Sequence, residues 1–161
     1  MQYDHVDRLL VQWLQQRPDL DCSPMGVIGR ISRMSRIVDK KLDKTFKNNN
    51  LSAIEFDILA ALRRFNSLTT PTELYQTLML SSGAMSTRVE QLVQRNLVER
   101  IYSEEDRRSC NLRLTKEGRS LIDKVISEHL VNEDEILKPL NQEQREQLAS
   151  LLRTWLLANE K

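Results

Sequence analysis

The sequence predicts a mainly α-helical protein with one small β-hairpin, and three observations support this fold class. Apolar residues recur every three or four positions over most of the 161 residues, which is the spacing of one face of an α-helix. The composition, with 40% hydrophobic residues, 29% charged residues and four glycines, favours a helical globule with a core. One stretch alternates apolar and polar residues on both sides of a charged loop, as a β-hairpin does. A chain of this length is expected to form one domain, residues 1–161.

The N-terminal part of the chain predicts two helices. The first covers Asp4 to Gln16 and ends before Pro18, because proline disfavours the helical conformation in the residue that precedes it. The second begins near Ser23, with proline in its first turn, and continues to Lys47. A stripe of arginines and lysines on this second helix is a solvated face or, as the lesser alternative, lies near phosphates. The apolar side of the first helix consists of Leu9, Leu10, Trp13 and Leu14.

The middle of the chain, about residues 52–115, predicts a winged helix-turn-helix. Ser52 and Glu55 form a capping box that opens one helix, and Thr70 with Pro71 opens a short positioning helix. A second, recognition helix then runs toward Asn96, where a helix would stop. Residues 97–102 and 110–115 follow as two strands around a polar loop, residues 103–109. The whole hairpin is the wing.

The outer side of the recognition helix is suited to reading DNA, because its residues are small or hydrogen-bonding groups that can approach base edges in a major groove. Phosphate contacts would position the protein and base contacts would specify the site. We expect Ser86, Thr87 and Gln91 to face bases. Ser81 and Ser82, with the amides at the helix start, are expected to bind phosphates, since the helix dipole favours an anion there.

The wing loop ends in two arginines, which a hairpin that only covers a core would not need. We expect Arg108 to enter the minor groove and Arg107 to reach a phosphate. Asp106 is expected to hold the arginines of the wing by charge-assisted hydrogen bonds.

Two further helices are predicted after the wing. One runs from Lys116 to about Leu137, and Asn141 with Gln144 forms a capping box for the last one. An amphipathic helix with little chain left to cover it indicates a partner surface. The apolar side of this last helix consists of Leu148, Leu151, Leu152, Trp155 and Leu156.

Charge, cysteines and histidines exclude several functions. The net charge of +1 does not by itself indicate nucleic acid, so basic groups must be segregated if DNA is the partner. No apolar run is long enough for a membrane span and no signal-peptide core is visible, which predicts a cytoplasmic protein without a membrane partner. Cys22 and Cys110 lack metal spacing and are expected to be thiols, while His5 and His129 belong to no metal or nucleophile pattern. We expect no catalytic residues, metal or cofactor, and no enzymatic activity.

Residues 80–92, 96–100 and 105–119 resemble the MarR family (multiple antibiotic resistance regulators) of winged-helix transcriptional regulators, over nearly the whole chain. The family's wing signature, Asp-x-Arg and then a strand ending in Leu-Thr, is matched by Asp106, Arg108, Leu114 and Thr115. The resemblance implies an obligate-type homodimer whose dimerisation region is built from helices at about residues 4–47 and 116–159. It also implies binding to a palindromic double-stranded operator, with recognition helices roughly 34 Å apart.

The extra N-terminal helix with Trp13, together with residues 56–59 and 82–88, is similar to the urate-responsive branch of that family. This resemblance implies that Trp13, Asp57 and Arg88 form a ligand site, and that Arg100 is a further arginine linked to the response. An indole stacks on a flat purine, and the planar fork of arginine binds an anionic heterocycle. The alternative is a core tryptophan beside an ordinary buried Asp–Arg pair.

The sequence therefore predicts a DNA-binding transcriptional regulator, a repressor that a small aromatic or purine ligand such as urate releases from its operator. A MarR-type regulator that responds to phenolic or other aromatic acids, or to cysteine oxidation, is one alternative. A helical dimerisation adaptor that binds no DNA is another.

Overall fold

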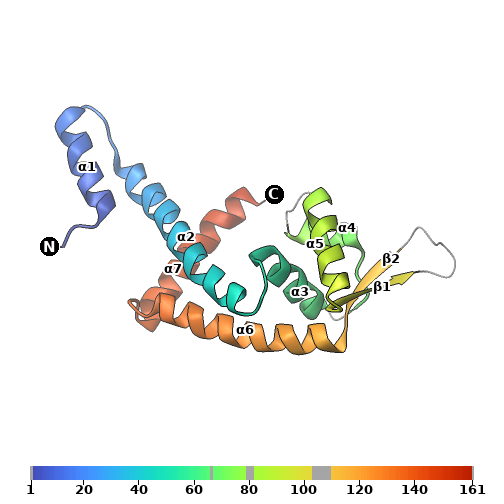
Figure 1. The fold of residues 1–161 in the computed structure, drawn as a ribbon. Coiled ribbons are helices and arrows are strands. Elements are labelled where there is room, and N and C mark those ends of the chain that lie inside the picture. Colours follow the sequence, from blue (N-terminus) through green and yellow to red (C-terminus); the bar gives the residue numbers. More distant parts are fainter. Residues whose placement is uncertain (1, 66, 79–81, 103–109, 161) are drawn as a thin grey trace. The chain divides into compact units, whose positions relative to one another are not determined.

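The computed structural model describes residues 2–65, 67–78, 82–102 and 110–160, in which helices accompany one two-stranded sheet (Figure 1). The chain divides into two compact units, residues 1–41 and 42–161. The organisation as one domain stays a prediction. The described elements are α1 (His5–Gln16), α2 (Ser23–Asn48), α3 (Ala53–Phe65), α4 (Pro71–Leu78), α5 (Ser82–Gln94), β1 (Val98–Tyr102), β2 (Cys110–Leu114), α6 (Lys116–Leu137) and α7 (Gln142–Asn159).

Residues 1–41 form a helical hairpin of α1 and most of α2, held by one arginine. Asp4 and Asp7 make a capping box at the start of α1, so the helix predicted from Asp4 begins one residue later with Asp4 as its cap. Arg30 of α2 donates Nε to Asp4 (2.8 Å) and Nη2 to Asp7 (2.6 Å). Gly29 of α2 faces Val6 of α1, and a Cβ at Gly29 would lie 3.4 Å from a methyl group of Val6.

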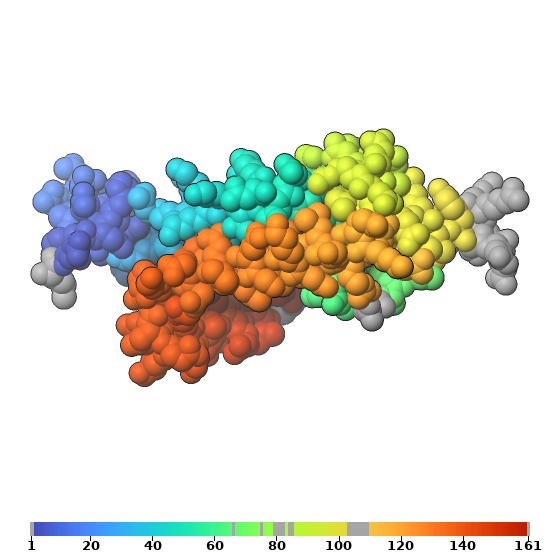
Figure 2. Space-filling model, turned by 60° about the horizontal axis from the view of Figure 1, so that its bottom comes forward, coloured from blue at the N-terminus to red at the C-terminus, as the bar shows by residue number. Residues whose placement is uncertain are grey.

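The core of residues 42–161 is built around α3, which packs against α4, α5, α6 and β2. Ile58, Leu59 and Ala61 of α3 have no exposed surface. In Figure 2, α6 forms a continuous ridge, with α5 and the strands beside its N-terminal end. The helix-turn-helix and the strands are therefore mounted on α3 and on the start of α6.

Two asparagines follow the ends of helices, and at Asn96 this is the helix stop that the sequence predicts. Asn50 and Asn96 adopt positive φ angles of 54° and 55° after α2 and α5. At Asn96 the next amide, that of Leu97, donates back to Leu92 (2.9 Å) while the Asn96 amide donates to Val93 (2.9 Å), which is the Schellman pattern. This arrangement turns the chain from the recognition helix directly into the wing.

The strands pair antiparallel with Val98 opposite Leu114 and Tyr102 opposite Cys110. Each is one residue shorter than the sequence predicted. Leu97 belongs to the helix stop, and Thr115 caps α6, where its hydroxyl oxygen accepts from the Gly118 amide at 2.9 Å. The start of α6 lies so close to Leu97 that a Cβ at Gly118 would fall 1.9 Å from the Leu97 carbonyl oxygen.

The C-terminal helices α6 and α7 begin and end as the sequence predicts. Asn141 and Gln144 form the expected capping box, with both hydrogen bonds at 2.9 Å. Arg145 pairs with Asp134 and donates to the Leu140 carbonyl, which fixes the turn between the helices. No residue of α7 is buried. Within the described ranges, no helix combines the length and hydropathy that a bilayer crossing requires.

Candidate nucleic-acid interface and effector site

The recognition helix α5 has a buried side and a polar side, as the sequence predicts. Val89 and Leu92 are almost fully buried against the core. Ser86, Thr87 and Gln91 are exposed on the surface. The three side chains predicted to face bases are thus accessible to DNA.

The predicted base-reading and effector residues meet on α5 itself. Arg88, which is half-buried, donates Nη1 to the side-chain oxygen of Gln91 at 3.0 Å. One residue predicted to contact an effector therefore holds a residue predicted to contact a base. The i, i+3 spacing of the two residues on a helix permits this bond, and this spacing is a signal that the sequence itself contains.

Arg100 joins the wing to the recognition helix. Its Nη2 lies 3.0 Å from Oε2 of Glu90, and both side chains are only partly exposed. Glu90 was not among the predicted site residues, so sequence reasoning missed this pair. The two residues are ten positions apart in different elements, and nothing in their spacing would have revealed the contact.

Asp57, the third residue of the predicted effector site, belongs to α3. Among the described residues, no hydrogen bond or ion pair joins it to Arg88. Desolvation by the surrounding protein raises the pKa of the Asp57 carboxyl, although the residue is exposed on the surface. The positive charges of Arg64 and His129 act in the opposite direction. Asp57 therefore faces a different basic environment from the one the resemblance implies.

The acid on which the charge of Arg88 acts is Glu55, which is buried. Burial disfavours its charge, but hydrogen bonds from the amide and hydroxyl of Ser52 and the charges of Arg95 and Arg88 prevail, so the pKa of Glu55 is lowered. Arg95, just after α5, donates to Glu55 (3.0 Å) and to the Asn50 carbonyl (2.8 Å). Glu55 was predicted only as a helix cap, yet it also anchors the end of the recognition helix.

His129 lies in an aromatic cluster near Asp57. Its ring is 4.8 Å from that of Phe56 and 5.4 Å from that of Phe46, measured between centroids. Its Nε2 lies 3.1 Å from Glu133, while Nδ1 is buried and has no hydrogen-bond partner among the described residues. The histidine is part of the packing between α2, α3 and α6, and sequence spacing did not predict this position.

Trp13 belongs to the N-terminal unit, where it is 41% exposed and lines a hollow of about 510 Å³ between α1 and α2. The hollow has almost wholly apolar walls and no charged side chain among its lining residues. It suits a flat apolar ring and supplies no cation for an anion. The lining residues are Val6, Leu9, Leu10, Trp13, Pro24, Met25, Ile28, Gly29 and Ser32.

Three of the predicted DNA contacts, Ser81, Arg107 and Arg108, lie outside the described residues, and so does Asp106, which was predicted to hold the arginines of the wing. Ser82 is the first residue of α5, as expected for a residue at the phosphate-binding end of the helix. Cys22 and Cys110 are free thiols that are partly exposed. The described residues contain no cluster of three or more histidine, cysteine or acidic side chains that could hold a metal.

Comparison with known proteins gives matches at the levels of family, sequence and fold. The MarR family profile matches residues 49–109. The HTH-type transcriptional regulator PecS of Dickeya dadantii (strain 3937) is 43% identical over 152 residues, which cover 93% of this chain and 92% of PecS. The crystal structure of apo MarR from E. coli aligns with a TM-score of 0.69 and 25% identity over 80% of this chain and 96% of MarR.

A cysteine-to-serine variant of MarR from E. coli, solved in complex with operator DNA, aligns with a TM-score of 0.71. The alignment covers 89% of this chain and 97% of that chain at 23% identity, so it shows likeness of fold alone.

Proposed function

The chain belongs to the MarR family of transcriptional regulators, and we therefore propose that it is a cytoplasmic, sequence-specific repressor that binds a palindromic operator as a homodimer. We further propose that urate or a related small aromatic or purine ligand releases it from DNA. The observation that carries the proposal is the bond between Arg88 and Gln91, because it connects the proposed effector site to the proposed base-reading surface.

The proposed DNA contacts divide by role. Ser86, Thr87 and Gln91 read bases, and their exposure opposite the buried side of α5 supports this assignment. Ser81 and Ser82 bind phosphates at the start of α5. In the wing, Arg108 enters the minor groove, Arg107 binds phosphate and Asp106 holds the arginines.

The proposed effector site consists of Trp13, Asp57, Arg88 and Arg100. Both arginines are already bonded to side chains of α5, Arg88 to Gln91 and Arg100 to Glu90. An anionic ligand that takes either guanidinium must compete with these bonds, and so it acts directly on the position of Gln91 and on the link between wing and recognition helix. Release of DNA follows if the ligand binds more tightly to the rearranged protein than to the operator-bound form.

The homodimer is supported by α7, whose apolar residues lack any buried position within the described chain. Trp155 is 53% exposed and Leu151 is 70% exposed. A second copy that covers this surface would place two recognition helices about one DNA turn, roughly 34 Å, apart.

A gel-shift titration with the protein's own promoter region tests the proposal, with urate, other purines and aromatic acids added in turn. Urate is expected to release the DNA and to quench tryptophan fluorescence. Trp13→Phe should lose most of the quench while Trp155 still fluoresces. If no purine releases DNA or quenches the wild-type protein, the ligand assignment is wrong, and release by aromatic acids would favour the second ligand class.

A further inference from the structure

Glu55 is a buried acid that the proposed function does not use, and it is bonded to the chain at the C-terminal end of the recognition helix. Its side chain is 9% exposed, and its Oε1 accepts from Nη1 of Arg95 at 3.0 Å. Its Oε2 accepts from the amide and the hydroxyl of Ser52, at 2.7 and 2.8 Å. Both carboxylate oxygens are thus bonded, and a fully satisfied buried network of this kind is rigid.

Arg95 makes a second bond with the same guanidinium. It donates Nη2 to the Asn50 carbonyl at 2.8 Å, in the turn between α2 and α3. This turn is itself fixed, because Asn50 has a positive φ and the Leu51 amide donates back to the Phe46 carbonyl at 2.9 Å. The guanidinium is planar and its donors point in fixed directions, so the two bonds define an angle as well as a distance.

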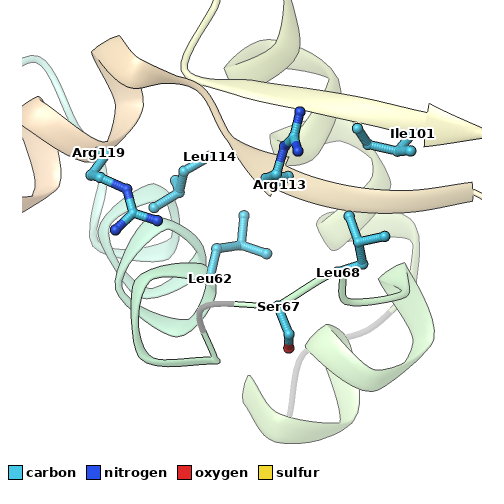
Figure 3. A pocket seen from close by; sticks show the side chains of 7 residues that line it. All are labelled: Leu62, Ser67, Leu68, Ile101, Arg113, Leu114 and Arg119. Atoms are coloured by element: carbon cyan, nitrogen blue, oxygen red, sulfur yellow. The ribbon is translucent and has the colours of Figure 1, made fainter.

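The rest of the packing around α5 fixes its tilt less strictly. Val89 and Leu92 decide which side of α5 is buried, but apolar packing has no preferred direction. On the wing side, a second hollow of about 320 Å³ lies between the two strands, the loop after α3 and the start of α6 (Figure 3). Leu62 and Ile101 line this hollow, and side chains beside a hollow make fewer van der Waals contacts than those in a filled core. Arg95 supplies the directional contact that this packing lacks.

We propose that Arg95, bonded to Glu55, is a positioning residue that sets the tilt of the recognition helix and, through it, the half-site spacing that the dimer accepts. This inference rests on the proposed binding of a palindromic operator by a homodimer. With 13 residues, α5 is about 20 Å long, so a small tilt about Arg95 moves the base-reading side chains along the groove. The same movement in both subunits changes the separation of the two recognition helices.

Two other roles for Arg95 give different results in a binding experiment. An ion pair that only stabilises the fold would lower the Tm of a variant and leave the operator affinity of the folded protein unchanged. The Arg95 side chain is 35% exposed, and a direct contact with phosphate would reduce the salt slope by about one when the arginine is removed. A positioning residue instead weakens operator binding at an unchanged salt slope.

Arg95→Gln in the full chain tests the proposal, with Arg63→Gln as the matched control. The Arg63 side chain is also 35% exposed, and it pairs with Asp123 between α3 and α6, without any residue of α5. The probes are the operator duplex from the protein's own promoter region and two altered duplexes. One has a base pair added between the half-sites, and the other has a base pair removed. Binding is measured well below the Tm of each variant.

The wild type is expected to bind the natural spacing at least about fivefold more tightly than either altered spacing, which is the smallest loss usual for one mismatched base pair. Arg95→Gln should weaken the natural operator about fivefold or more and reduce the spacing preference to less than about twofold, at an unchanged salt slope. Arg63→Gln should lower the Tm and keep the wild-type affinity and spacing preference.

Glu55→Gln checks the pair from its other side. It should reproduce the losses of Arg95→Gln, because glutamine still accepts a hydrogen bond from Ser52 but carries no charge for Arg95. The double variant should lose no more affinity than either single variant, since the two residues act as one unit.

Unchanged operator affinity, an unchanged spacing preference, or a salt slope lowered by about one in Arg95→Gln would overturn the proposal. So would additive losses in the double variant, or an equal loss of operator affinity in Arg63→Gln. Failure of the proposed function is a different result. The wild type would then bind no duplex from the promoter region, or would bind without requiring two half-sites, and this inference would fall with it.

Discussion

At the scale of single residues, both arginines of the proposed effector site already bind side chains of the protein. Arg88 is bonded to Gln91, and Arg100 is paired with Glu90, in both cases at 3.0 Å. Both partners are on α5. A ligand that binds either arginine must therefore displace a side chain of the recognition helix, and so it would act on this helix directly.

Arg88→Ala is expected to abolish the ligand response. The wild-type ratio of operator affinities without and with urate should be about fivefold or more, within the usual range of allosteric coupling. In the variant this ratio should approach one, because the cation that recognises the anion is gone. The ratio is measured from operator affinities with and without urate, for the wild type, for Arg88→Ala and for Arg153→Ala as control. A variant that keeps the wild-type ratio contradicts the assignment of Arg88.

Asp57→Asn is expected to stabilise the fold near neutral pH and to leave it unchanged in acid. The raised pKa of Asp57 means that the folded protein holds the proton more tightly than the unfolded chain does. Stability from this group is complete below its ordinary value of 3.8 and is lost as the pH rises through the raised value. Asparagine cannot ionise, so it removes this loss. Thermal unfolding of the wild type and the variant, near neutral pH and in acid, tests the prediction. A lower Tm for the variant near neutral pH would refute it.

At the scale of elements, the start of α6, the end of α5 and the wing are packed as one joint. Gly118 admits no side chain because the Leu97 carbonyl oxygen occupies the place of a Cβ. Thr115 caps α6 and also bonds the Asn96 carbonyl, so the joint combines a tight contact with hydrogen bonds. These contacts set the position of β1 and β2 relative to the recognition helix.

Gly118→Ala should destabilise the protein by about 1–3 kcal/mol, the usual cost of forcing extra atoms into a packed site. Gly83→Ala is the matched control, because a Cβ there meets nothing within 4 Å and alanine favours a helix by up to about 1 kcal/mol over glycine. Urea unfolding of both variants measures the difference. A Gly118→Ala protein as stable as Gly83→Ala would show that the joint is looser than its geometry indicates.

Arg108→Ala tests the wing as a DNA contact. Loss of a cation from the minor groove should weaken binding to all operator sequences and reduce the salt slope by roughly one per arginine removed. Gln91→Ala should instead change which sequences are preferred, because it removes a base contact. Binding isotherms at several salt concentrations separate the two effects. An unchanged affinity and slope for Arg108→Ala would exclude the wing assignment.

At the scale of the whole molecule, the exposed apolar surface of α7 is the proposed dimer interface. Burial of apolar surface contributes roughly 25 cal/mol per Å², and no residue of this helix is fully buried within the described chain. Aliphatic side chains and one tryptophan repeat along one side of the helix, and a second copy offers the same surface. The exposed residues are Leu148, Leu151, Leu152, Trp155 and Leu156.

Leu152→Glu is expected to convert the protein to a monomer, because a carboxylate cannot be buried in an apolar interface without a partner. Leu152 is 39% exposed in the single chain, so the substitution should leave the fold of the chain intact. Ser150→Glu adds the same charge to another side of α7 and should keep the dimer. Sedimentation velocity distinguishes the two states, and a dimeric Leu152→Glu protein would rule out this surface as the interface.

The sequence by itself determined the elements and their ends, because these depend on neighbours in the chain. The capping boxes at Ser52 and Asn141 and the stop at Asn96 involve groups within five residues of one another. The alternation of the strands and the spacing of apolar residues in the helices are local in the same way. The wing motif allowed the family to be identified before any contact was known.

Only the tertiary structure decided which charged and aromatic groups meet. The pair of Arg100 with Glu90, the contact of Arg95 with Glu55 and the position of His129 against Phe56 all join different elements. The two hollows likewise arise where separate elements leave space between them. A sequence pattern specifies which face of a helix is buried, but the partner across that face depends on how the elements pack. For this reason Asp57 and Arg88 could be matched to a family motif, while their actual neighbours could not be foreseen.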